Sequence, residues 1–195
     1  MEKVTENPEK IWPENLFELN DIIALGEEHG KDDEAILSLI EQFSSQIDGV
    51  FYEEPVNLQP SIDLYLSTGE ISADLESLFK GAEKEGKNIR NGMLKILDRL
   101  RELNIGVICI DSSKIQTDEY KTRSSNGYYF LRGESRDEDM FDNIMKYYQS
   151  HRGKYVVVCG SYHLGEEDHF RSGKDTLGTR LKKAIPDKSE SIIIS

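Results

Sequence analysis

The chain has 195 residues, of which 37% are hydrophobic and 31% are charged, a composition typical of a globular protein with one sizeable core. Its formal net charge of −13 argues against nucleic-acid and anionic-membrane partners, because both require a basic face. No apolar run approaches the roughly 20 residues of a membrane span. The opening stretch MEKVTENPEK does not resemble a signal peptide, so we expect a cytoplasmic protein whose two cysteines, Cys109 and Cys159, are reduced and buried.

Short apolar runs alternate with helical patterns along the chain. The runs are IIAL at 22–25, GVFY at 49–52, GVICI at 106–110, YVVVC at 155–159 and SIIIS at 191–195. Each run is continuous, as in strands that are buried on both faces of a parallel sheet. Apolar residues three and four apart predict helices between them, over 35–43, 88–104, 136–148 and 176–186. This alternation predicts one α/β domain over residues 1–195, with a largely parallel sheet flanked by helices.

Two segments interrupt the alternation. Residues 55–85 have the pattern of short helices inserted after the second strand. Residues 112–135 form a long connection with little periodicity, and such connections are often lids or binding loops. Tyr128 and Tyr129 lie in this segment, and we expect them to face a ligand.

Acids or histidines follow each of the first four strands, where the carboxyl ends of parallel strands form a common edge. They are Glu27, Glu28 and His29 after the first strand, Glu53 and Glu54 after the second, Asp111 after the third and His163 after the fourth. Ligands gather at this edge of a parallel sheet, because loops and helix N-termini converge there. We therefore expect the site at the carboxyl edge.

Both histidines belong to a Gly-x-x-His motif, GEEH at 26–29 and GSYH at 160–163. Glycine permits a sharp turn or a close backbone approach, which would let the histidine return over the strand end. Neighbouring residues of a strand point to opposite faces, so Glu53 and Glu54 cannot both face the site, and we favour Glu53.

Four motifs, GEEHG, FYEEP, RDEDMFDN and GSYH, occur in this order along nearly the whole chain. Together they resemble the superfamily that joins erythromycin esterases, ChaN-like haem-uptake proteins, Tiki-type proteases and related toxin domains. RDEDMFDN is similar to the Arg-Asp-x-x-Met-Ala-x-Asn signature of erythromycin esterases, through Arg136, Asp137, Met140 and Asn143.

The resemblance implies an α/β fold and a hydrolase that cleaves an ester or amide bond in a small-molecule or peptide substrate. The catalytic residues that it implies are His29, His163, Glu27, Glu53 and Arg136. In esterase-like members a histidine activates water and the arginine meets the developing oxyanion. In protease-like members a divalent metal activates water, and here its ligands would be His29, His163, Glu27 and Glu53.

Two alternatives to a hydrolase follow from the same resemblance. ChaN-like members imply a binder of haem or of another small ligand, with Tyr128, Tyr129 or a histidine on the iron. Toxin-related members imply an effector domain, which would be secreted rather than cytoplasmic. The predicted ligand contacts outside the catalytic set are Glu28, Glu54, Asp111, Tyr128 and Tyr129.

Overall fold

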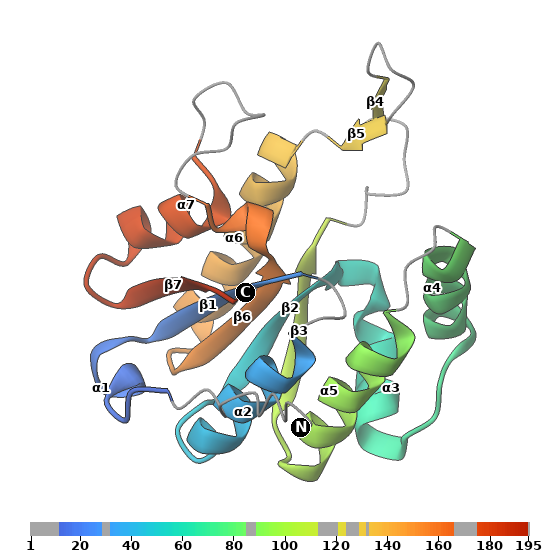
Figure 1. Cartoon of the computed structure of the whole chain (residues 1–195), viewed down its shortest axis with the longest axis horizontal. Helices are drawn as coiled ribbons and strands as arrows, with labels where there is room; N and C mark the ends of the chain where they lie inside the picture. The colour runs from blue at the N-terminus through green and yellow to red at the C-terminus, as the bar shows by residue number, and fades with distance from the viewer. Residues whose placement is uncertain are drawn as a thin grey trace, which may run out of the picture.

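A computed structural model of the chain describes residues 12–28, 32–84, 89–112, 121–123, 129–131, 133–165 and 175–194. Five of the described strands form a parallel sheet in the order β3-β2-β6-β1-β7 (Figure 1). They are β1 (Ile22–Glu27), β2 (Gly49–Pro55), β3 (Gly106–Asp111), β6 (Tyr155–Gly160) and β7 (Ser189–Ile193). The predicted α/β class and parallel sheet are therefore confirmed.

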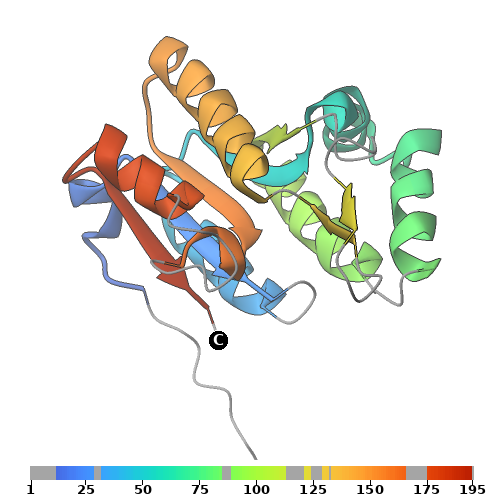
Figure 2. The ribbon, with the colours of Figure 1, turned by 90° about the horizontal axis from the view of Figure 1, so that it is seen from above.

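Helices cover both faces of this sheet (Figure 2). One face carries α1 (Leu16–Leu19), α2 (Asp33–Phe43), α3 (Gln59–Thr68), α4 (Ala73–Lys84) and α5 (Arg90–Glu102). The other carries α6 (Gly133–Ser150) and α7 (Leu177–Ala184). The chain therefore forms three layers, with a hydrophobic core on each side of the sheet.

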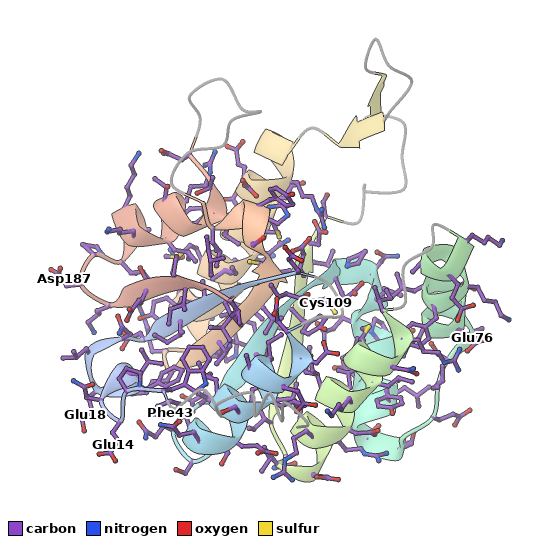
Figure 3. The ribbon with its side chains drawn as sticks, viewed as in Figure 1. Glu14, Glu18, Phe43, Glu76, Cys109 and Asp187 are labelled. Carbon is purple, nitrogen blue, oxygen red and sulfur yellow. The ribbon has the colours of Figure 1, made fainter. Side chains whose placement is uncertain are left out.

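The central strands are buried on both faces because their residues alternate between the two cores. In β1, Ile23 and Leu25 pack against α2 and its neighbours, whereas Ile22 and Ala24 pack against α6 and α7. Full burial of one such aliphatic side chain stabilises the fold by about 1.5–3 kcal/mol. Figure 3 shows side chains filling both layers, with Phe43 and Cys109 inside and Glu76 and Asp187 at the periphery.

The two edge strands differ from the central ones. Among the described strands, β7 pairs with β1 alone, and three of its five residues are exposed, including the apolar Ile193. At the opposite edge, the side-chain amide of Gln59 bonds to β3. Its Nε2 donates to the Val107 carbonyl at 2.8 Å, and its Oε1 accepts from the Cys109 N–H at 2.7 Å.

Both interruptions of the alternation contain regular structure. Within residues 55–85, the described part forms η1 (Val56–Leu58), α3 and α4, in agreement with the predicted short helices. Within 112–135, β4 (Lys121–Arg123) and β5 (Tyr129–Leu131) pair as an antiparallel hairpin, which Figure 1 shows apart from the central sheet. The lid function of this segment stays a prediction. Across the described ranges, the helices fall short of the length and apolar character that crossing a membrane requires.

Candidate functional site

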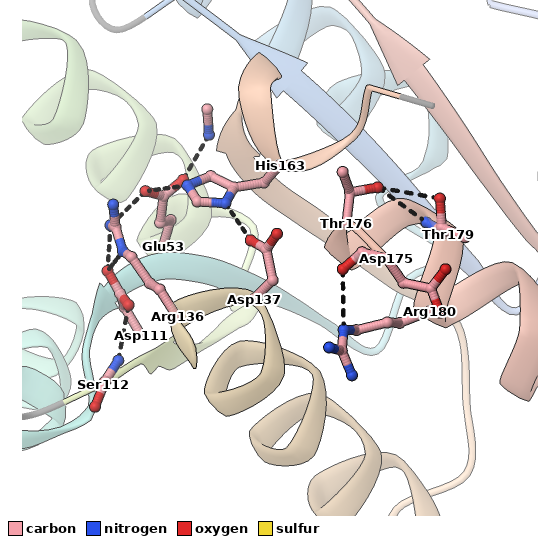
Figure 4. Close-up of polar contacts among 11 residues, drawn as sticks. Glu53, Asp111, Ser112, Arg136, Asp137, His163, Asp175, Thr176, Thr179 and Arg180 are labelled. Carbon is pink, nitrogen blue, oxygen red and sulfur yellow. Dashed lines mark hydrogen bonds and ion pairs between the residues drawn. The ribbon is translucent and has the colours of Figure 1, made fainter. Parts of the chain in front are cut away.

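Charged side chains from four elements meet at the carboxyl edge of the sheet (Figure 4). Their exposed fractions range from 0% to 18%, so the group is largely shielded from water. The residues are Glu53 near the end of β2, Asp111 at the end of β3, Arg136 and Asp137 in α6, and His163 in the short helix η4 (Ser161–His163) after β6. We call these five residues the charged network.

His163 lies between two carboxylates. Its Nδ1 pairs with Asp137 Oδ1, and its Nε2 is 3.3 Å from Glu53 Oε1. Burial alone would lower the pKa of His163, but the bonds to Asp137 and Glu53 outweigh it and raise that pKa to about 9. The imidazole is therefore protonated at neutral pH, with both ring nitrogens acting as donors.

Arg136 joins two further carboxylates. Its Nη2 donates to Glu53 Oε1 at 2.5 Å and also to Asp111 Oδ2, and its Nε donates to the same Asp111 oxygen at 2.8 Å. Glu53 and Asp111 raise the pKa of Arg136 well above its ordinary value, against the opposing effect of burial. Asn143 in the same helix donates to the Ile110 carbonyl at 2.9 Å, which holds α6 against the end of β3.

The two carboxyls bound by Arg136 differ in their pKa. Burial raises the pKa of Glu53, but His163 and Arg136 overcome this effect and hold it at about 2. Burial also raises the pKa of Asp111, and there Arg136 only partly offsets it. Glu53 is consequently a firmly ionised carboxylate, and Asp111 is more readily protonated.

Glu53 has a third donor in the backbone. The Gly160 N–H, at the end of β6, donates to Glu53 Oε2 at 2.5 Å. Glu54 lies toward the opposite face, where burial, and after it the charge of Glu54, raises the pKa values of Tyr52 and Cys109. The structure thus brings Glu53, rather than Glu54, to Arg136 and His163.

Gly26 explains how the turn that carries His163 fits against the sheet. A Cβ atom on Gly26 would lie 2.9 Å from Ser161 Cα, a separation that real Cβ atoms essentially never show. Gly26 lies inside β1, and it is not among the glycines with positive φ. The glycine of the first motif is therefore needed for close approach of the second motif's turn, and not for a sharp turn of its own.

The remaining predicted residues take different positions. Glu27 ends β1 opposite Gly160, and it is 8% exposed. Glu28 is exposed, and its backbone N–H donates to Asp32 Oδ2 at 2.7 Å. His29, Tyr128 and the side chain of Tyr129 lie outside the described residues.

Asp137 was not predicted as a site residue, although it belongs to the RDEDMFDN motif. It lies three residues before Met140 and seven before Ile144, on the buried side of α6, and all three are fully buried. An acid on the apolar stripe of a helix was the signal in the sequence. The Gly160 N–H could not be predicted in this way, because a backbone donor is present in nearly every residue and is not marked by the residue type.

The described residues do not fit a divalent metal ion. No group of three His, Cys, Asp or Glu side chains among them is arranged to hold one. Both nitrogens of His163 face carboxylates, and Glu53 Oε1 already accepts from the guanidinium of Arg136. A metal ion at this position would be repelled by the guanidinium of Arg136, which already supplies the positive charge there.

No protein-family model and no curated protein matches the sequence. Solved structures do match. Pasteurella multocida toxin, described with a thiol-protease-like catalytic triad in its C-terminal region, is 14% identical with a TM-score of 0.65, covering 93% of this chain and 24% of that one. The type III effector HopBA1 is 18% identical with a TM-score of 0.56, covering 90% of this chain and 76% of that one.

ChaN of Campylobacter jejuni, described with cofacial haem, is 16% identical with a TM-score of 0.51, covering 90% of this chain and 82% of that one. This chain spans only 34% of two further bacterial toxin chains. At such identities the likeness concerns the fold alone. The chain thus shares the α/β fold of these bacterial toxins, of the effector and of ChaN.

Proposed function

We propose that this chain is a hydrolase of ester or amide bonds, related to the domains of bacterial toxins and effectors. The observation that carries the proposal is the buried charged network at the carboxyl edge, in which a histidine is held by one acid and lies beside an arginine. An acid-supported histidine moves protons in many hydrolases, and a nearby guanidinium stabilises an oxyanion.

In the proposed reaction His163 moves the protons. In its deprotonated form, which predominates above its pKa of about 9, His163 accepts a proton from water at Nε2 while the water oxygen bonds to the carbonyl carbon of the substrate. Arg136 stabilises the resulting oxyanion. The oxyanion then collapses and the bond from the carbonyl carbon to the leaving oxygen or nitrogen breaks while His163 gives that atom the proton, so that a carboxylic acid and an alcohol or amine are formed.

The acids act through the histidine and the arginine in this scheme. Asp137 fixes the His163 ring through Nδ1 and stabilises its protonated form. Asp111 holds Arg136 through Nε. Glu53 pairs with Arg136 and His163 until the substrate binds. Glu27, whose strand end pairs with Gly160, orients the attacking water. His29, from the first Gly-x-x-His motif of the sequence, is proposed as an additional base.

A thiol mechanism has little support in this chain. Its two cysteines are buried, and burial raises the pKa of Cys109 to about 12 and that of Cys159 well above its ordinary value. A thiol is a poor nucleophile under these conditions. The proposal therefore uses water as the nucleophile.

Haem binding is the second candidate, favoured by the fold shared with ChaN. Both ring nitrogens of His163 already face carboxylates, so the iron ligand would come from Tyr128 or Tyr129. A hemin titration tests this function: a Soret band that disappears in a Tyr128→Phe/Tyr129→Phe double variant would favour it over hydrolysis.

The hydrolase is tested by screening chromogenic esters and amides of different acyl groups with the wild type, His163→Ala and His151→Ala. His151 is the matched control, because it is exposed and stacks on Tyr147 after the end of α6. We expect His163→Ala to lose about 100-fold or more of the activity, the usual contribution of one acid–base group. Activity that survives this substitution, or that both variants lose equally, would rule out the proposed mechanism.

A further inference from the structure

Three hydrogen-bond donors converge on the carboxylate of Glu53. Gly160 N–H is 2.5 Å from Oε2, Arg136 Nη2 is 2.5 Å from Oε1, and His163 Nε2 is 3.3 Å from the same oxygen. A backbone N–H, a guanidinium and an imidazolium around two oxygens are an arrangement that recognises carboxylates. We call these donors the three-donor site.

We propose that the three-donor site binds a carboxylate ligand, and that Glu53 fills it as an internal ligand until an external carboxylate takes its place.

The donors have supports that do not depend on Glu53. Asp111 holds Arg136 through Nε and Nη2, and Asp137 holds His163 through Nδ1. Gly160 lies at the end of β6, which pairs with β1 on one side and with β2 on the other. The donors would therefore keep their positions after Glu53 left, which is the preorganisation that a binding site needs.

The backbone at Glu53 is suited to such a movement. Pairing between β2 and β6 ends at Tyr52, and the register between β2 and β3 shifts between Tyr52 and Pro55. Irregular strand ends of this kind re-aim side chains next to binding sites. Glu53 can thus move without breaking the regular part of the sheet.

The ligand class follows from the reaction, and this link rests on the proposed function. Cleavage of an ester or amide passes through an oxyanion and leaves a carboxylate. Both species offer the negatively charged oxygens that Glu53 now presents to the three donors. The acid product would therefore compete with Glu53, and the substrate's acyl group would lie at the three-donor site.

Formate is the probe that tests the site, because it is a carboxylate without a side chain. Glu53→Ala leaves the donors in place and opens room for it. Formate at about 100 times its dissociation constant should raise the melting temperature of this variant by about 5–10 °C, with saturation. Formamide and an equal concentration of chloride should have no such effect.

Glu54→Ala is the matched control, since Glu54 follows Glu53 in β2 and lies toward the other face. The wild type and Glu54→Ala should be stabilised far less by the same formate concentration than Glu53→Ala, because formate must first displace Glu53, and the double variant Glu53→Ala/Arg136→Met should show no formate-specific stabilisation. The proposal would be overturned if Glu53→Ala melted at the same temperature with formate and with chloride.

Glu53→Ala could also fail to give a cooperative melting transition without ligand. In that case its refolding from urea is measured with formate and with chloride, and recovery with formate alone supports the site, whereas equal recovery overturns it. None of these measurements needs a substrate. A negative result in the hydrolase screen would therefore leave the carboxylate site tested separately.

Discussion

Replacement of Arg136 by methionine tests how much the charged network depends on its central cation. Methionine retains most of the volume of the side chain and removes the charge and every donor. Glu53 and Asp111 would then lie buried side by side, with side chains that are 5% and 1% exposed, and the guanidinium between them would be gone. Removal of one partner from a buried ion pair typically costs about 3–5 kcal/mol.

The pKa of Glu53 gives a second way to calculate how much folding stability depends on this network. A fall of that pKa from 4.5 to about 2 corresponds to about 3 kcal/mol of net stabilisation, after burial has opposed the effects of His163 and Arg136. Arg136 also serves Asp111, so we expect Arg136→Met to lower the free energy of unfolding by about 3–5 kcal/mol at pH 7. Arg136→Lys keeps the charge but cannot present the forked guanidinium, and it should lose about half as much.

Urea unfolding at pH 7 and pH 5 measures these losses. Without Arg136 the pKa of Asp111, which burial already raises, should rise further. A carboxyl whose pKa is raised on folding favours the folded state at low pH and loses this advantage as the pH rises through its folded value. The loss in free energy of unfolding caused by Arg136→Met should therefore be smaller at pH 5 than at pH 7. A loss below about 1 kcal/mol, or the same loss at both pH values, would refute the reasoning, since a buried unpaired carboxylate costs more than that.

Three further predictions concern the same edge of the sheet. The raised pKa of His163 stabilises the fold fully below pH 6.5, and this contribution should disappear as the pH rises through about 9; a urea midpoint that is constant from pH 6 to 9.5 would contradict it. Asp137→Asn should lower the pKa of His163 from about 9, as followed by NMR titration of its ring protons, and an unchanged titration would show that the contact is unimportant. Gly26→Ala should destabilise the protein by about 1–3 kcal/mol in urea unfolding, because its Cβ would press on Ser161. Gly106→Ala, where a Cβ meets nothing within 4 Å, is the control, and an equal loss in both would exclude a steric cause.

The five strands of the central sheet could be predicted from the sequence because each is a short apolar run with turn residues on both sides, whereas β4 and β5, three residues each, lie in the segment with little periodicity. Strand order could not, since the run that becomes β6 carries no local mark that places it between β1 and β2. The last strand begins at Ser189, two residues before the expected Ser191. As an edge strand it has exposed positions, and Glu190 does not interrupt it there.

The candidate site could be predicted as a place, but its contacts could not. Acids and a histidine at strand ends, together with the motif resemblance, indicated Glu53, Asp111, Arg136 and His163. The pairing of each acid with a cation depends on distances between side chains of different strands and helices, and the spacing of residues in the sequence does not give these distances. Asp137, fully buried in α6, is the partner that this reasoning left out.

The bridge between Gln59 and β3 bears on the solubility of this protein. A free edge strand offers a row of unsatisfied peptide groups, and such rows template intermolecular pairing and fibril growth. Gln59 presents one donor and one acceptor to the Val107 carbonyl and the Cys109 N–H, much as a peptide group of a neighbouring strand would. An aggregating chain would first have to displace this amide, so a single side chain in α3 raises the barrier to assembly at that edge.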